Sequence, residues 1–142
     1  MLKGSKTAEN LMKSFAGECQ ARTRYTYYSS IAKKEGYIQI ANIFMETAEQ
    51  EKEHAKIFLK FLKSEYNDEE IEIKASYPVA LHEETKNNLM KAADGENAEW
   101  TKDYPQFAQI AKKEGFNKIA MAYEKIAKIE ARHERRYRRL LN

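Results

Sequence analysis

The hexapeptide IAKKEG occurs twice in this chain of 142 residues, at 31–36 and again 79 positions later, at 110–115. In each copy two lysines precede a glycine. Lysines stabilise the negative end of a helix dipole, and glycine readily adopts the left-handed conformation that ends many helices. Each copy therefore predicts the end of one helix and the start of another, as in an antiparallel hairpin. The repeat predicts two such hairpins.

Apolar residues recur with a helical period in four stretches, at about 7–35, 38–63, 85–114 and 117–141. The segment 64–84 contains Pro78 and has no sustained period. Bundles with one long crossover form the ferritin-like class. We therefore expect an all-α, ferritin-like four-helix bundle in one domain, 1–142, with hairpin one at about 7–63, the crossover at 64–84 and hairpin two at about 85–141.

Composition narrows the classes of protein that fit. Cys19 is the single cysteine, so one chain can form neither a disulfide nor a cysteine-rich metal site. No apolar run has the length of a signal peptide core or a membrane span. We expect a cytoplasmic protein without membrane or nucleic-acid partners. The basic run at 132–141 is interpreted as a solvated helix face, with docking of an acidic partner as a second interpretation.

The repeat also relates two pairs of polar residues. With the shift of 79, Glu51 aligns with Glu130 and His54 aligns with His133. Each Glu-x-x-His pair lies on the same helix face as the apolar stripe. A duplicated core explains matching apolar positions, but buried carboxylates are costly unless a positive charge compensates them. The two pairs therefore predict a metal site.

The first and third helices carry further carboxylates. Glu18 lies on the apolar stripe of the first helix, and Glu96 and Glu99 lie in the third. An α-helix rises 1.5 Å per residue, so the number of residues from the glycine of a hairpin turn gives the distance along the helix axis. By this count the three carboxylates lie about as far from the turn of their hairpin as the Glu-x-x-His pair of the same hairpin does. The sequence thus predicts that four helices bring five carboxylates and two imidazoles to one level.

The third helix contains one residue more than the first. Glu18 precedes the first IAKKEG by 13 positions, whereas Glu96 precedes the second by 14. A single inserted residue in a helix forms a π-bulge, and π-bulges are common at functional sites. We therefore expect a π-bulge between Glu96 and Tyr104, which would turn Glu99 toward the site.

Carboxylates combined with two imidazoles suit iron or manganese and can accept zinc. One Glu from each of two helices plus Glu-x-x-His from each of the other two is the di-iron carboxylate arrangement. Two ferrous ions about 3.5–4 Å apart could bind both ends of a small dioxygen species and deliver two electrons. Hydrogen peroxide or dioxygen are therefore the expected substrates. A purely structural bundle would not explain buried Glu and His in register.

Five stretches resemble the ferritin-like domain of the rubrerythrin family over essentially the full chain: FAGECQARTRYTYY, ETAEQEKEHA, ASYP, DGENAEWTKDYPQFAQIAKKEGF and KIEARHERRY. The resemblance implies a non-haem di-iron peroxidase that reduces hydrogen peroxide to water in oxidative-stress defence. It also implies a set of metal ligands consisting of Glu18, Glu51, His54, Glu96, Glu99, Glu130 and His133.

The same resemblance assigns individual roles. Glu51 and Glu130 would bridge the two irons. His54 and Glu99 would exchange at one iron as the redox state changes. Tyr25 and Tyr104 resemble tyrosines that hydrogen-bond near the metal ligands. The candidate catalytic residues are therefore Glu99, His54, Tyr25 and Tyr104.

One feature of the family is missing from this sequence. Rubrerythrins usually carry a small rubredoxin-like domain with a four-cysteine iron site, and this sequence has one cysteine. Either the sequence is part of a longer protein, or it is a stand-alone form that takes electrons from an external donor such as a rubredoxin-like protein. The resemblance implies a homodimer, and the long crossover would permit hairpin swapping. A ferritin-like iron-oxidising or iron-holding protein is the alternative function, and iron–zinc or manganese centres remain alternatives to two irons.

Overall fold

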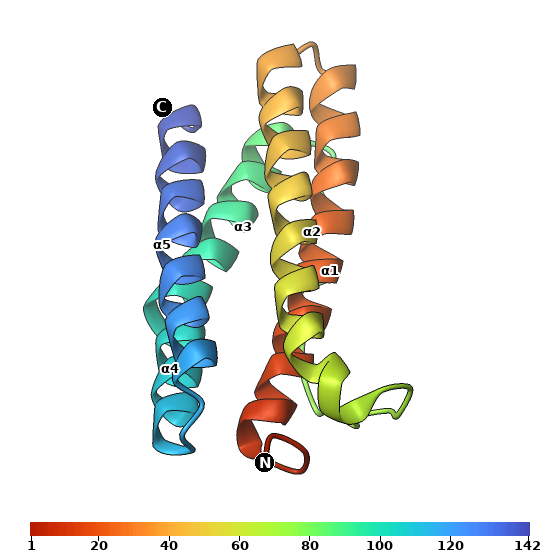
Figure 1. Cartoon of the computed structure of the whole chain (residues 1–142). Coiled ribbons are helices and arrows are strands. Elements are labelled where there is room, and N and C mark those ends of the chain that lie inside the picture. The colour runs from red at the N-terminus through yellow and green to blue at the C-terminus, as the bar shows by residue number, and fades with distance from the viewer.

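Four long helical segments make up the computed structural model, which describes residues 1–142 (Figure 1). They are α1 (Lys6–Lys34), α2 (Ile38–Tyr66), a third segment of α3 (Thr85–Ala98), the π-helical turn η1 (Glu99–Asp103) and α4 (Tyr104–Lys113), and α5 (Asn117–Leu140). α1 packs beside α2, and α3 and α4 pack beside α5 (Figure 1). The prediction of an all-α four-helix bundle is confirmed. No helix combines the length and apolar character needed to cross a membrane.

Both IAKKEG copies form the predicted helix ends. Gly36 and Gly115 have φ angles of 88° and 89°, in the left-handed region. The amide of Gly36 donates to the carbonyl of Lys33, and the amide of Gly115 donates to that of Lys112, at 3.0 and 3.1 Å. Because α2 and α5 begin directly after these turns, each copy closes one antiparallel hairpin.

The crossover is shorter than expected, because α2 continues beyond Lys63 to Tyr66. The last residues of α2 contact the N-terminal loop. The Glu65 carboxylate accepts the amides of Leu2 and Lys3, at 3.1 and 2.9 Å, and the Tyr66 hydroxyl accepts the amide of Gly4 at 2.8 Å. The segment 67–84 then runs without helix or strand to the opposite end of the bundle (Figure 1).

The glutamate of each IAKKEG copy caps the first helix of the other hairpin. The Glu35 carboxylate accepts the Thr85 amide at 2.6 Å and the Thr85 hydroxyl. The Glu114 carboxylate accepts the Thr7 amide at 2.8 Å and the Thr7 hydroxyl. The first amides of a helix lack partners within the helix, so each glutamate satisfies donors of a neighbouring element. Each copy of the motif therefore ends the first helix of its own hairpin, and its glutamate connects that hairpin to the other one by hydrogen bonds.

We expect Glu35→Ala and Glu114→Ala each to lower the melting temperature by about 2–4 °C, with nearly additive effects because the two caps lie at opposite ends of the bundle. Hydrogen bonds from Thr85 lower the pKa of Glu35, so its contribution is present at neutral pH and is lost as the pH falls through that pKa. Thermal unfolding followed by circular dichroism measures both effects. The exposed Glu124→Ala is the control, and unchanged melting temperatures in both cap variants would contradict the assignment.

Two aromatic clusters form the core, one toward each end of the bundle. The first is centred on Tyr25, Phe44 and Tyr137, and the second on their repeat counterparts Tyr104, Tyr123 and Phe58. Each cluster contains side chains from both hairpins, so the duplication gives the bundle an approximate two-fold symmetry. The level of the predicted metal site lies between these clusters.

Candidate metal centre

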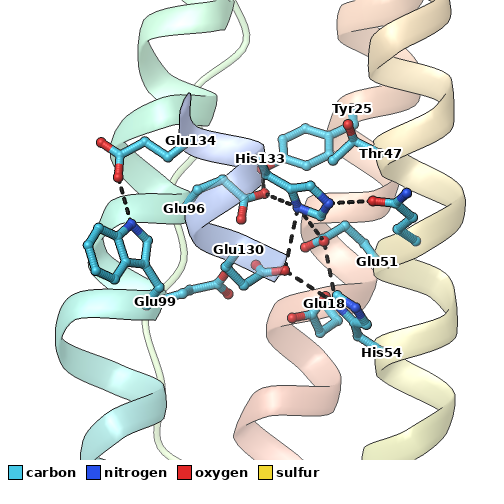
Figure 2. A network of polar contacts seen from close by, with 12 residues as sticks. Glu18, Tyr25, Thr47, Glu51, His54, Glu96, Glu99, Glu130, His133 and Glu134 are labelled. Atoms are coloured by element: carbon cyan, nitrogen blue, oxygen red, sulfur yellow. Dashed lines mark hydrogen bonds and ion pairs between the residues drawn. The ribbon is translucent and has the colours of Figure 1, made fainter. Parts of the chain in front are cut away.

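Glutamate and histidine side chains from both hairpins point toward one another in the interior of the bundle (Figure 2). Glutamate or histidine side chains come from α1, α2, α3 and α5, and all are at most 6% exposed: Glu18, Glu51, His54, Glu96, Glu130 and His133. The structure thus brings together six of the seven residues that the sequence predicts as ligands.

One group of four potential ligands surrounds His54. Its Nδ1 atom lies 3.3 Å from an oxygen of Glu130, 3.6 Å from one of Glu18 and 3.7 Å from one of Glu51. Two donors about 2.1 Å from one metal ion lie roughly 3.0–3.4 Å apart at usual coordination angles. The spacing of this group is therefore close to what a single ion requires.

A second group surrounds His133. Its Nδ1 atom lies 3.4 Å from oxygens of Glu51 and Glu96 and 3.5 Å from one of Glu130. In both groups the potential ligand atoms lie within 4.8 Å of one another. Glu51 and Glu130 belong to both groups. The arrangement is therefore that of two adjacent ion positions with two carboxylates in common.

The buried polar atoms of this cluster lack partners, which a metal pair would supply. Both carboxylate oxygens of Glu51 and of Glu130 have no hydrogen bond. The same holds for one oxygen each of Glu18 and Glu96 and for Nδ1 of both histidines. Buried polar atoms without partners are rare because they cost free energy. Since all these atoms are metal-ligand types, the residues fit a pair of divalent cations.

The electrostatics of the cluster also favour bound cations. Burial raises the pKa of Glu51 and of Glu130 well above the usual value, and the nearby carboxylates add to the shift. Burial acts in the same direction on Glu96, but the nearby His133 imidazole and the hydrogen bond from the Tyr25 hydroxyl act against it, and that pKa is lowered. Without cations, the cluster must therefore hold protons, which metal binding would displace.

Two tyrosines connect the hairpins through this cluster. The Tyr25 hydroxyl of hairpin one donates to Glu96 of hairpin two at 2.9 Å, and the Tyr104 hydroxyl of hairpin two donates to Glu18 of hairpin one. Burial and the neighbouring glutamates raise both phenol pKa values well above 10, so both phenols stay protonated donors. Each tyrosine thereby orients a glutamate of the opposite hairpin that belongs to only one of the two ligand groups.

The predicted π-bulge is confirmed as η1, which begins at Glu99. Glu99 is partly exposed and belongs to neither group of four, but its carboxylate accepts a 3.5 Å hydrogen bond from Tyr104. Figure 2 shows its side chain extending from the third helical segment toward Glu130. Because Tyr104 also bonds Glu18, Glu99 lies on the His54 side of the centre.

Two further residues support the site without having been predicted from the sequence. The Gln50 side chain accepts a hydrogen bond from Nε2 of His133. Glu134 accepts the Trp100 indole N–H at 2.6 Å and an Asn97 amide N–H at 3.1 Å, which ties η1 to α5 (Figure 2). Glu134 follows His133 directly, but neither residue belongs to a ligand pattern, so only the tertiary structure reveals them.

The centre is reached from solvent between α2 and α5. A cavity of about 710 Å³ is lined by His54, His133, Gln50 and Ile129 and by charged residues at its rim. Since both histidines border it, small molecules can approach the two ion positions from this side.

Comparison with known proteins agrees with this geometry. The family model described as rubrerythrin matches residues 9–141. Rubrerythrin of Clostridium perfringens is 61% identical over 139 residues, which cover 98% of this chain and 71% of that protein. Rubrerythrin-1 of Clostridium acetobutylicum is 61% identical over 141 residues, covering 99% of this chain and 72% of that protein.

A solved structure supports the same assignment. The fully reduced, all-ferrous state of nigerythrin superposes with a TM-score of 0.85 at 31% identity and covers 100% of this chain and 71% of that one. The ferritin-like form of the bundle is thereby confirmed. The chain belongs to the rubrerythrin family of di-iron proteins.

Proposed function

We propose that this protein is a non-haem di-iron peroxidase that reduces hydrogen peroxide to water in oxidative-stress defence, with electrons from a separate donor. The observation that carries the proposal is the pair of overlapping buried ligand groups with an additional carboxylate, Glu99, beside one of them. Membership of the rubrerythrin family supports the same reaction.

Each group of four would hold one iron. Glu18 and His54 would bind the first ion and Glu96 and His133 the second, while Glu51 and Glu130 would bridge them. When bound, the ferrous pair supplies two electrons to the O–O bond. Hydrogen peroxide, two electrons and two protons yield two water molecules, so the donor must return two electrons per turnover.

The remaining residues orient the ligands and limit access of water. Tyr25 and Tyr104 hold Glu96 and Glu18 through hydrogen bonds that cross between the hairpins. The two aromatic clusters close the centre toward both ends of the bundle. Peroxide would enter through the cavity between α2 and α5, which both histidines line.

Glu99 and His54 would alternate as ligands when the redox state changes. This role is supported by their position, because Tyr104 contacts both Glu99 and Glu18, and Glu18 belongs to the His54 group. An extra carboxylate favours the more highly charged ferric ion, whereas a neutral imidazole suits the ferrous ion. We further propose a rubredoxin-like donor and a homodimeric protein in the cytoplasm.

The function is tested by loading the protein with ferrous iron without air, counting irons per chain and mixing with hydrogen peroxide or dioxygen in a stopped-flow instrument. We expect two irons per chain and oxidation of both by one peroxide, much faster than by dioxygen. Faster reaction with dioxygen would instead favour an iron-oxidising or oxygen-reducing protein. Absence of a stable iron pair would contradict the assigned ligands.

A further inference from the structure

The approximate two-fold symmetry of the centre is broken next to the bridging carboxylates. The repeat matches the glutamates, histidines and tyrosines of one hairpin with those of the other. The residue before Glu51 is Gln50, however, and its counterpart before Glu130 is Ile129. A hydrogen-bonding side chain in one hairpin is thus replaced by an apolar one in the other.

Gln50 holds the ring of His133. Its side-chain oxygen accepts the hydrogen bond of Nε2, which leaves the lone pair of Nδ1 directed at Glu51, Glu96 and Glu130. Such a bond fixes the tautomer and orientation of a metal-binding imidazole and makes it a better ligand.

His54 has no equivalent bond. The polar contacts of its ring are those of Nδ1 with Glu18, Glu51 and Glu130, and Ile129 lines the same two cavities as the His54 ring. One of these, a cavity of about 430 Å³ lined mainly by apolar residues, borders His54 but not His133. The His54 ring therefore lacks an anchor and has free space beside it.

The symmetry is broken a second time at the ion position beside His54. Glu99 has no counterpart in hairpin one, because η1 contains the extra residue of the third helical segment. Its contact with Tyr104 places it on the side of Glu18 and His54. A weakly held ligand and a spare ligand thus occur together at one of the two ion positions.

We propose that Gln50 and Ile129 make the two metal positions unequal. Gln50 is a positioning residue that anchors His133 and makes its position the tight one, whereas Ile129 leaves His54 free to dissociate. This inference rests on the proposed metal pair and adds to it the two residues that hold one histidine in place and leave the other without an anchor.

The inference is tested by exchanging the two residues. Metal-free protein is titrated with ferrous iron under anaerobic conditions against a competing chelator, which gives the two stepwise affinities. Zinc-loaded protein is examined by NMR for slowly exchanging imidazole N–H protons. The variants are Gln50→Ile, Ile129→Gln and the double exchange. Gln50→Glu retains an acceptor, and Glu49→Gln, in the same cavity, is the control.

In the wild type we expect the first ion to bind at least about tenfold more tightly than the second, and one protected ring N–H. Gln50→Ile should weaken the tighter step by about 10- to 100-fold and remove that N–H signal. Gln50→Glu should retain the tight first binding step and the protected N–H signal. Ile129→Gln should tighten the weaker step and create a second protected N–H.

Equal affinities for the first and the second ion in the wild type would overturn the role of Gln50 while leaving the metal pair intact. So would affinities and imidazole N–H signals that are unchanged in Gln50→Ile. Failure of the wild type to bind two ions would instead overturn the proposed centre itself. Because Gln50 is exposed, its substitution tests ligand positioning rather than folding.

Discussion

Replacing Glu51 or Glu130 by glutamine is expected to abolish the paired metal site and to stabilise the metal-free protein. Each carboxylate belongs to both ligand groups, so one substitution removes a donor from both ion positions. In the metal-free protein the same carboxylates lie buried without a hydrogen bond. A neutral amide of similar size removes the cost of burying that charge, about 1–3 kcal/mol, which would raise the melting temperature by about 3–10 °C.

The effect depends on pH in a defined direction. Burial raises the pKa of Glu51 and of Glu130 in the folded state. A group with a raised folded pKa contributes stability that is fully present below its unfolded pKa, and this stability is lost as the pH rises through the folded pKa. The metal-free wild type should therefore lose stability as the pH rises above about 4.5. The glutamine variants should lose less.

Bound metal reverses this dependence, because the carboxylates must lose their protons to bind ions. Metal content by elemental analysis and thermal unfolding with and without ferrous iron, from pH 5 to pH 8, measure both effects. Glu53→Gln, an exposed substitution on the same helix, is the control. A variant that keeps two ions per chain would contradict the bridging assignment. A variant whose metal-free form is no more stable than the wild type at pH 8 would contradict the cost assigned to burying the carboxylate.

Most of the bundle could be predicted from local sequence patterns. The two IAKKEG copies predict the hairpins because helix ends depend on a few neighbouring residues. The π-helical turn follows from counting, since one extra residue between Glu96 and Tyr104 has no other place in a continuous helix. Six predicted ligands converge because residues at equal heights on antiparallel helices must lie at one level.

Contacts between the hairpins could not be predicted in the same way. The bonds of Glu35 to Thr85 and of Gln50 to His133 depend on how two separate elements pack, and no spacing within either element encodes them. The extension of α2 to Tyr66 has a similar cause, because the N-terminal loop binds its last turn. The ligand roles of all seven residues stay predictions, and Glu99 differs from the other six because it lies outside both groups of four.

Glu99→Ala is expected to retain two metal ions per chain but to slow peroxide turnover by about 100-fold. The variant keeps every member of both ligand groups, because Glu99 belongs to neither. It loses the carboxylate that would replace His54 when the ion beside it is oxidised. Metal content, ferrous affinity and steady-state peroxide reduction with an added donor separate binding from turnover. Asp103→Ala is the matched control, since Asp103 lines the same cavities as Glu99.

The outcome also distinguishes the two candidate functions. A protein that only holds or oxidises iron has less need of an exchangeable seventh ligand, so equal turnover in Glu99→Ala and the wild type would contradict the role of Glu99 and weaken the peroxidase proposal. Loss of both ions would instead make Glu99 a permanent ligand. Retained ions with slow turnover would link the inserted residue of η1 to catalysis, because that insertion is what places a carboxylate beside the weakly anchored His54.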